Sequence, residues 1–138
     1  MFFVKNKKEN IDINLIKVAA LLIHVAKIDE NFSEIEEKII KKTLIDMGAE
    51  KDAVLSILKD AKKIEENSNQ ILEFTKEIKS MNEMNKIKIL ETLWNIIYSN
   101  NEADVYETSL MRRLEGLLYI DNKTMGSIKQ KIKNKYLK

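Results

Sequence analysis

The residues of this chain best suited to chemistry are acidic and amide side chains in two polar turns that resemble each other. The first turn, from Asp29 to Glu36, reads DENFSEIE, and the second, from Asn100 to Glu107, reads NNEADVYE. An offset of 71 positions relates the two turns at both ends. Carboxylate and amide oxygens that alternate along a turn suit hard cations such as Ca²⁺ and Mg²⁺. One interpretation of both turns is therefore a site for a divalent cation.

The candidate ligands of such a cation come from both turns. The main set is Asp29, Glu36, Asp104 and Glu107, with Glu30, Asn100 and Glu102 as further oxygen donors. With oxygen donors alone, Ca²⁺, Mg²⁺ or Mn²⁺ is expected rather than Zn²⁺. The chain has one histidine and no cysteine, which excludes multi-histidine and thiolate metal sites.

The first turn shares the start of a calcium-binding EF-hand loop, but the likeness stops there. Asp29, Asn31 and Ser33 occupy the first, third and fifth positions of such a loop. The sixth position holds Glu34 in place of glycine, and the twelfth holds Ile40 in place of glutamate. The spacing therefore excludes an EF-hand.

Helix capping is the second interpretation of the same residues. Ser33 and Glu36 have the spacing of a capping box, in which the hydroxyl accepts a backbone N–H and the glutamate reaches back to the cap. Asp104 and Glu107 have the same spacing, with a charge that suits a helix N-terminus. The sequence leaves both interpretations open.

Apolar periodicity predicts the helices that must position the two turns. A helix capped by Asn10 or Asp12 and running to about Lys27 is apolar nearly all round, so we expect it to be central. A helix over about 83–98 repeats its pattern and should lie beside it. The other predicted helices cover 33–48 with Gly48 as the stop, 51–65, 70–79, a segment from Asp104 to about Leu118, and a last one capped by Asp121 or Asn122.

These helices predict an all-α fold of about seven helices in one bundle-like domain. The chain has no proline and three glycines, so little in it breaks a helix. We expect residues 1–9 to form a loose arm and residues 10–138 to form the domain. The similar halves, about 11–66 and 82–138, should be related by a pseudo-twofold axis.

Charge and hydropathy exclude several classes of partner. The net charge of +2 does not favour nucleic acid, and we expect the lysine-rich C-terminal stretch to be a solvated helix end. The longest apolar stretch, Ile16 to Val25, is too short to span a bilayer and contains Lys17 and His24. No secretory signal is visible, so we expect a cytoplasmic protein without membrane insertion.

The remaining candidates for chemistry are weak. His24 lies on a narrow polar stripe, and we expect an edge histidine rather than an acid–base catalyst. Trp94 and Tyr98, four positions apart, are expected in the core. No nucleophile elbow or glycine-rich phosphate loop is present, so we expect no enzyme; a hydrolase with paired carboxylates is the minor alternative.

The two turns resemble the motifs of the TerB family of tellurite resistance proteins. The segment AKIDENFSEIE, from Ala26 to Glu36, is similar to that family's pattern A-x-x-D-G-x-(V/I)-S-x-x-E. The segment from Trp94 to Glu107, followed by Arg112 and Arg113, is similar to the second motif, L-W with A-D-G-x-(I/V)-D-x-Y-E. The resemblance covers roughly residues 12–132.

The resemblance implies an all-α fold of about seven helices with internal pseudo-symmetry. It also implies that acidic residues at two helix junctions can bind a divalent metal, and that the protein works with stress-response systems. Related domains accompany J-domain co-chaperones.

This chain departs from the family pattern in both turns. Glu30 and Asn101 replace the glycine, and Asn100 replaces the second aspartate. Losing that aspartate removes one formal charge from the proposed site, which should lower its affinity for a dication.

The sequence therefore predicts a non-enzymatic, TerB-like stress-response protein that binds a divalent cation at its two helix junctions. The alternative is a metal-free domain that docks a protein partner or co-chaperone through an exposed helical groove. The oligomeric state is not predicted.

Overall fold

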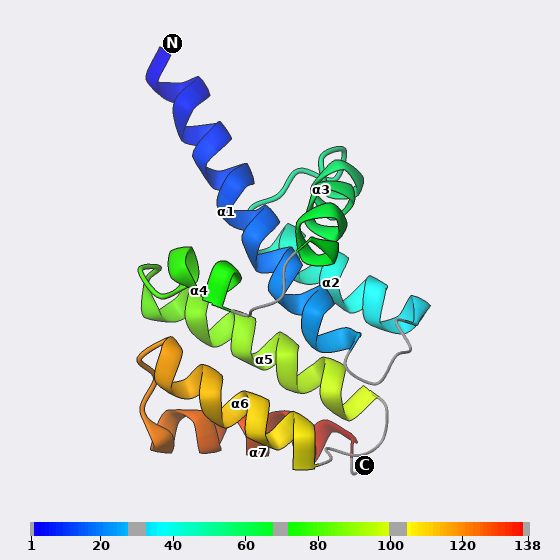
Figure 1. The fold of residues 1–138 in the computed structure, drawn as a ribbon, viewed down its shortest axis with the longest axis vertical. Helices are drawn as coiled ribbons and strands as arrows, with labels where there is room; N and C mark the ends of the chain where they lie inside the picture. Colours follow the sequence, from blue (N-terminus) through cyan, green and yellow to red (C-terminus); the bar gives the residue numbers. More distant parts are fainter. Residues whose placement is uncertain (1, 28–32, 68–71, 100–104, 137–138) are drawn as a thin grey trace.

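The computed structural model describes residues 2–27, 33–67, 72–99 and 105–136, with side chains from residue 14 onward except at Leu72 and 105–107. This part of the chain forms seven α-helices and no strand (Figure 1). In chain order they are α1 (Phe2–Ala26), α2 (Glu34–Asp46), α3 (Val54–Glu66), α4 (Leu72–Ile78), α5 (Glu83–Ser99), α6 (Val105–Leu117) and α7 (Asn122–Tyr136). The predicted all-α class with about seven helices is confirmed.

The core is built around α1 and α5, the two helices that the sequence predicted to be central. Every residue from Val18 to Ile23 is at most 1% exposed, and α1 contacts α2, α3, α4 and α5. In α5, Ile89, Leu90 and Leu93 are fully buried, and this helix contacts α1, α2 and α7. A helix that is apolar on every face must be covered on every face, because exposed apolar surface costs free energy in water.

The remaining helices pack around α1 and α5. Figure 1 shows α2 and α3 against α1, with α5 lying below the C-terminal part of α1. Beyond α5 lie α6 and α7, whose inward residues include Met111, Leu114 and Ile128. Of the helices that the structure describes, none combines the length and apolar character needed to cross a bilayer.

The N-terminal helix begins earlier than the sequence indicated. The expected start was Asn10 or Asp12, after a loose arm over residues 1–9, whereas α1 begins at Phe2. In Figure 1 these first turns extend away from the other helices. The segment contains no glycine or proline and is rich in lysine, so nothing in it stops a helix from continuing toward the N-terminus.

The helices α2 and α6 end in the same way, 71 residues apart. At the end of α2, Gly48 N–H donates to the Ile45 carbonyl and Ala49 N–H to the Leu44 carbonyl, and Gly48 has a φ of 113°. This is a left-handed stop of the kind predicted for Gly48. At the end of α6 the same pair of bonds is made by Tyr119 and Ile120, which donate to the carbonyls of Gly116 and Glu115.

Tyr119 therefore takes the place that Gly48 takes in the first half, and its φ of 57° is also positive. Positive φ is uncommon for residues with a side chain, because the Cβ crowds the backbone. A tyrosine in this conformation was not predicted from the sequence.

The cap of α7 is Asp121, which is one of the two residues predicted for this role from the sequence. Its Oδ1 accepts the Thr124 backbone N–H at 2.7 Å, and its Oδ2 accepts the Thr124 hydroxyl at 3.0 Å. The bond from the Thr124 backbone, supported by the hydroxyl bond, holds the pKa of Asp121 below its ordinary value of 3.8.

A carboxyl whose pKa is lowered by folding adds stability that is present above its unfolded pKa and lost as the pH falls through the folded pKa. We expect Asp121→Asn to keep the cap, since asparagine caps helices well, but to lose this dependence. Thermal melts between about pH 7 and pH 2.5 should then show a smaller acid destabilisation than in the unaltered protein. Two parallel curves of melting temperature against pH would contradict this role.

Candidate functional site

The first helix junction contains the predicted capping box. The Ser33 backbone N–H donates to Glu36 Oε1 at 2.8 Å, and the Glu36 backbone N–H donates to Ser33 Oγ at 3.2 Å. These two bonds satisfy donors at the start of α2 that have no partner within the helix. The capping interpretation of Ser33 and Glu36 is confirmed.

Glu36 is also fully buried, with 0% of its surface exposed. Removing a carboxylate from water is costly unless hydrogen bonds or positive charge compensate it. The Ser33 N–H and the positive end of the α2 dipole supply part of that compensation. The junction therefore holds a carboxyl group inside the protein, next to a turn whose sequence carries further acids.

The other predicted ligands lie outside the described part of the chain. Asp29 and Glu30 fall within residues 28–32, and Asn100, Glu102 and Asp104 within 100–104. Glu107 belongs to α6, but its side chain is among those not described. Of the predicted set, the structure thus places only the Glu36 side chain. Among the side chains that it places, no three His, Cys, Asp or Glu residues form a group that could hold a metal.

The helices that precede the two junctions are neighbours in the fold. The turns follow α1 and α5, and these two helices contact each other. Figure 1 shows both of them ending on the same side of the molecule. A further link joins α2 to α5, because the buried hydroxyls of Thr43 and Thr92 lie 2.7 Å apart.

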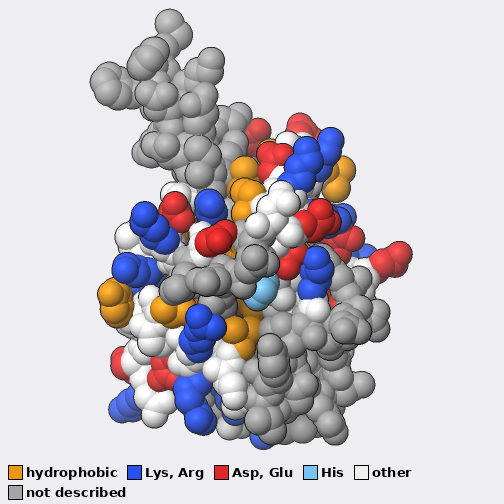
Figure 2. All heavy atoms as spheres, viewed as in Figure 1, with side chains coloured by type: hydrophobic (Ala, Val, Ile, Leu, Met, Phe, Trp, Pro, Cys, Tyr) orange, Lys and Arg blue, Asp and Glu red, His pale blue; other side chains and the backbone are white. Residues whose placement is uncertain are grey.

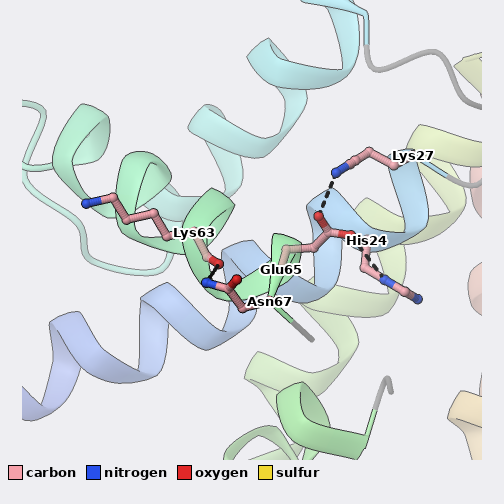
Figure 3. Close-up of polar contacts among 5 residues, drawn as sticks. All are labelled: His24, Lys27, Lys63, Glu65 and Asn67. Carbon is pink, nitrogen blue, oxygen red and sulfur yellow. Dashed lines mark hydrogen bonds and ion pairs between the residues drawn. The ribbon is translucent and has the colours of Figure 1, made fainter. Parts of the chain in front are cut away.

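A second polar cluster, which the sequence did not reveal, joins α1 to α3. Glu65 accepts a hydrogen bond from Lys27 Nζ at 2.7 Å, and its other oxygen lies 3.3 Å from His24 Nδ1 (Figure 3). The Glu65 side chain is only 9% exposed, whereas those of His24 and Lys27 are 29% and 42% exposed. The His24 ring also lies against Phe74 of α4, with 5.9 Å between the ring centroids.

One signal in the sequence could have identified this cluster. The buried face of α3 runs through Val54, Leu58 and Ala61 at helical spacing, and the next position on that face is Glu65. A carboxylate on an apolar face calls for a cation from another element. The two oxygens of Glu65 face His24 of α1 and Lys27, the residue that follows α1, so the cluster ties the end of α1 to α3.

The aromatic residues predicted for the core lie there. Trp94 and Tyr98 are 2% and 8% exposed and stack with 5.9 Å between their ring centroids. The Trp94 N–H faces the sulfur of Met125 at 3.4 Å, which joins α5 to α7. Burial raises the pKa of Tyr98. These aromatic side chains pack between helices, as predicted.

A hollow of about 260 Å³ lies between α2, α5 and α7. Thr43 and Thr92 lie in its lining, together with charged residues that include Lys42, Lys88 and Glu91. Lys88 Nζ donates to the Asp46 carbonyl at 3.3 Å, which fixes one edge of the hollow. This is a groove between helices of the kind that the metal-free alternative requires.

The Glu65 cluster makes a direct prediction about stability. We expect Glu65→Gln to lower the free energy of unfolding by about 1–2 kcal/mol, because a charge-assisted bond is lost while Lys27 stays partly solvated. Glu66→Gln is the matched control, because Glu66 is the next residue and is exposed. Urea unfolding of both variants measures the difference. Equal losses in the two would show that the Glu65 cluster contributes nothing specific.

Comparisons with known proteins agree with the fold. A family model described as "Tellurite resistance protein TerB" matches residues 15–130, which reach from α1 into α7. Neither the curated proteins nor the solved structures that were compared contain a match to the chain.

Proposed function

Because the chain belongs to the TerB family, we propose that it is a non-enzymatic, cytoplasmic stress-response protein that binds a divalent cation. The cation would be held by acidic residues at the α1–α2 and α5–α6 junctions. The proposed ligands are Asp29, Glu36, Asp104 and Glu107, with Glu30, Asn100 and Glu102 as further donors.

The observation that supports this proposal best is the complete burial of Glu36. A capping glutamate can satisfy its role at the protein surface, so the cap alone does not require the carboxylate to be inside. A buried carboxylate lowers the free energy of a cation bound beside it, since the two charges attract strongly where water is excluded. In the sequence, Asp29 and Glu30 precede this carboxylate in the same turn.

The donor chemistry indicates which cation would bind. All proposed ligands offer oxygen, and oxygen-only sites suit Ca²⁺, Mg²⁺ or Mn²⁺. The chain's single histidine, His24, faces Glu65. Zinc, which prefers nitrogen and sulfur ligands, is therefore the poorest fit.

Such a cation would act on the packing of the helices. The two junctions follow helices that contact each other, and α2 is joined to α5 through Thr43 and Thr92. Binding at both junctions would stabilise this packing, and losing the cation would loosen it. In this way a cation could set the state of a stress-response module without any catalysed reaction.

The test is a thermal melt of EDTA-treated protein titrated with Ca²⁺, Mg²⁺, Mn²⁺ and Zn²⁺. A ligand that binds only the native state adds about 2.7 kcal/mol of stability at 100 times its dissociation constant. We expect a saturable rise with an oxygen-preferring cation. Glu36→Gln should abolish the rise while keeping the capping box, which accepts glutamine as well as glutamate.

Glu34→Gln is the matched control, because Glu34 is an exposed acid in the same first turn of α2. It should melt and respond to cations like the unaltered protein. Asp104→Ala tests the second junction and should also abolish the rise. If no cation shifts the melting temperature of the unaltered protein, the proposal of a cation site is wrong.

In that case the metal-free alternative gains support. It would be a module that docks a protein partner or co-chaperone in the groove between α2, α5 and α7, where a hollow of about 260 Å³ is present. Crosslinking a partner to that groove, through a photoreactive residue placed at the exposed Lys42, would test this alternative.

A further inference from the structure

A second hollow lies where α4 and α6 end. It has a volume of about 350 Å³. We call it the Tyr119 site, and its lining consists of Thr75, Lys76, Lys79, Gly116, Leu117 and Tyr119. The walls are apolar at Leu117 and Tyr119, and the charged residues of the lining are both lysines.

Tyr119 is in an unusual position for a tyrosine. It is 72% exposed, and its backbone has the positive φ that Gly48 has at the end of α2. The two helix ends make the same hydrogen bonds, so the turn itself requires no side chain at this position. An exposed aromatic residue held in a strained conformation favours a role beyond folding.

Two lysines hold their charges close to the Tyr119 ring. Lys79 Nζ lies 5.5 Å from the ring centroid, and Lys86 Nζ lies 6.0 Å from it. Lys86 also donates to the Leu118 carbonyl at 3.0 Å, which ties the start of α5 to the turn that carries the tyrosine. The site therefore presents positive charge around an aromatic surface and a hollow.

The surroundings fit this description. On the side where Figure 1 draws α4 and the start of α5, Figure 2 shows blue Lys or Arg side chains interspersed with orange hydrophobic ones and with some red acidic ones. A surface of this kind is complementary to a ligand that carries both negative charge and an apolar group.

We propose that the Tyr119 site binds a short acidic segment of a partner protein. One apolar side chain of the segment would enter the hollow beside Leu117 and Tyr119. Carboxylates on either side of it would pair with Lys76, Lys79 and Lys86.

The chemistry of the lining favours a peptide over a nucleic acid. Both arginines of the chain, Arg112 and Arg113, lie outside the lining, although arginine is the side chain best shaped to hold phosphate. Nucleic acid would also need a long basic surface along its backbone. Three lysines around one apolar hollow match a compact contact of a few residues instead.

The test is amide NMR of the ¹⁵N-labelled full chain, titrated with a synthetic peptide that has one leucine between two runs of aspartate and glutamate. We expect saturable shifts confined to the amides of Thr75 to Lys79, Lys86 and Gly116 to Tyr119. A peptide with serine for the leucine, and one with asparagine and glutamine for the acids, should each bind about ten-fold more weakly.

Gly116→Leu tests the hollow itself. Gly116 is part of the lining, and a Cβ there would meet nothing within 4 Å, so we expect a leucine side chain to be accommodated and to occupy part of the hollow. Leucine also favours the helix over glycine, so the fold should be kept. We expect affinity for the peptide to fall about ten-fold. Gly126→Leu is the matched control, because Gly126 of α7 is equally open and lies outside the lining.

Tyr119→Gly separates binding from stability. It should weaken the peptide complex while leaving the melting temperature unchanged or higher, since glycine adopts positive φ without strain. A structural role for the tyrosine would instead lower the melting temperature.

Three results would overturn the proposal: no saturable shift with the leucine peptide, equal affinity in Gly116→Leu, or stronger binding of single-stranded DNA or phosphatidylserine vesicles at the same amides. All titrations are run in EDTA. Because the Tyr119 site contains none of the proposed cation ligands, its outcome is independent of the cation melts.

Discussion

The burial of α1 is the constraint on which the rest of this structure depends. From Val18 to Ala26 every residue except His24 is at most 2% exposed, so the helix has apolar side chains on every face. Burying each valine, leucine or isoleucine stabilises the fold by about 1.5–3 kcal/mol, and the gain is lost wherever a face meets water. Four helices, α2 to α5, therefore contact α1, and α5 is covered in turn by α7. The shape of the bundle follows from this need for cover.

The same constraint decides where polar groups can lie. His24 and Lys27 mark the end of the buried stretch, and they meet Glu65 because α3 is one of the helices that cover α1. Glu36 is buried at the start of α2 for a similar reason, since α2 also packs on α1 and α5. One of these carboxylates is compensated by side chains of another helix. The other accepts a backbone N–H of its own turn.

The features that depend on a few neighbouring residues, namely the helix caps and the helix stop, were predicted correctly from the sequence. The capping box of Ser33, the stop at Gly48 and the cap at Asp121 each need only a few neighbouring residues. The Glu65 cluster was missed because its partners are 38 and 41 positions away. The early start of α1 was missed because Asn10 and Asp12 are good caps, yet nothing before them opposes a helix. Among the predicted cation ligands, Glu36 is the one whose side chain the structure describes. Its capping role was predicted from the sequence, whereas its complete burial was not.

The two helix ends that lie 71 residues apart make the same backbone hydrogen bonds but have different residues at the surface. Gly48 and Tyr119 make equivalent turns, so the hydrogen bonds of the main chain determine the turn and leave the side chain free to vary. Glycine is the residue that the geometry favours, and a tyrosine there costs conformational strain. The strain can persist because α2 and α6 are anchored in the core by buried residues such as Leu44 and Leu114, and these helices hold each turn in place. A position that is fixed by the fold yet open to solvent is where a protein can gain a binding surface without losing its architecture.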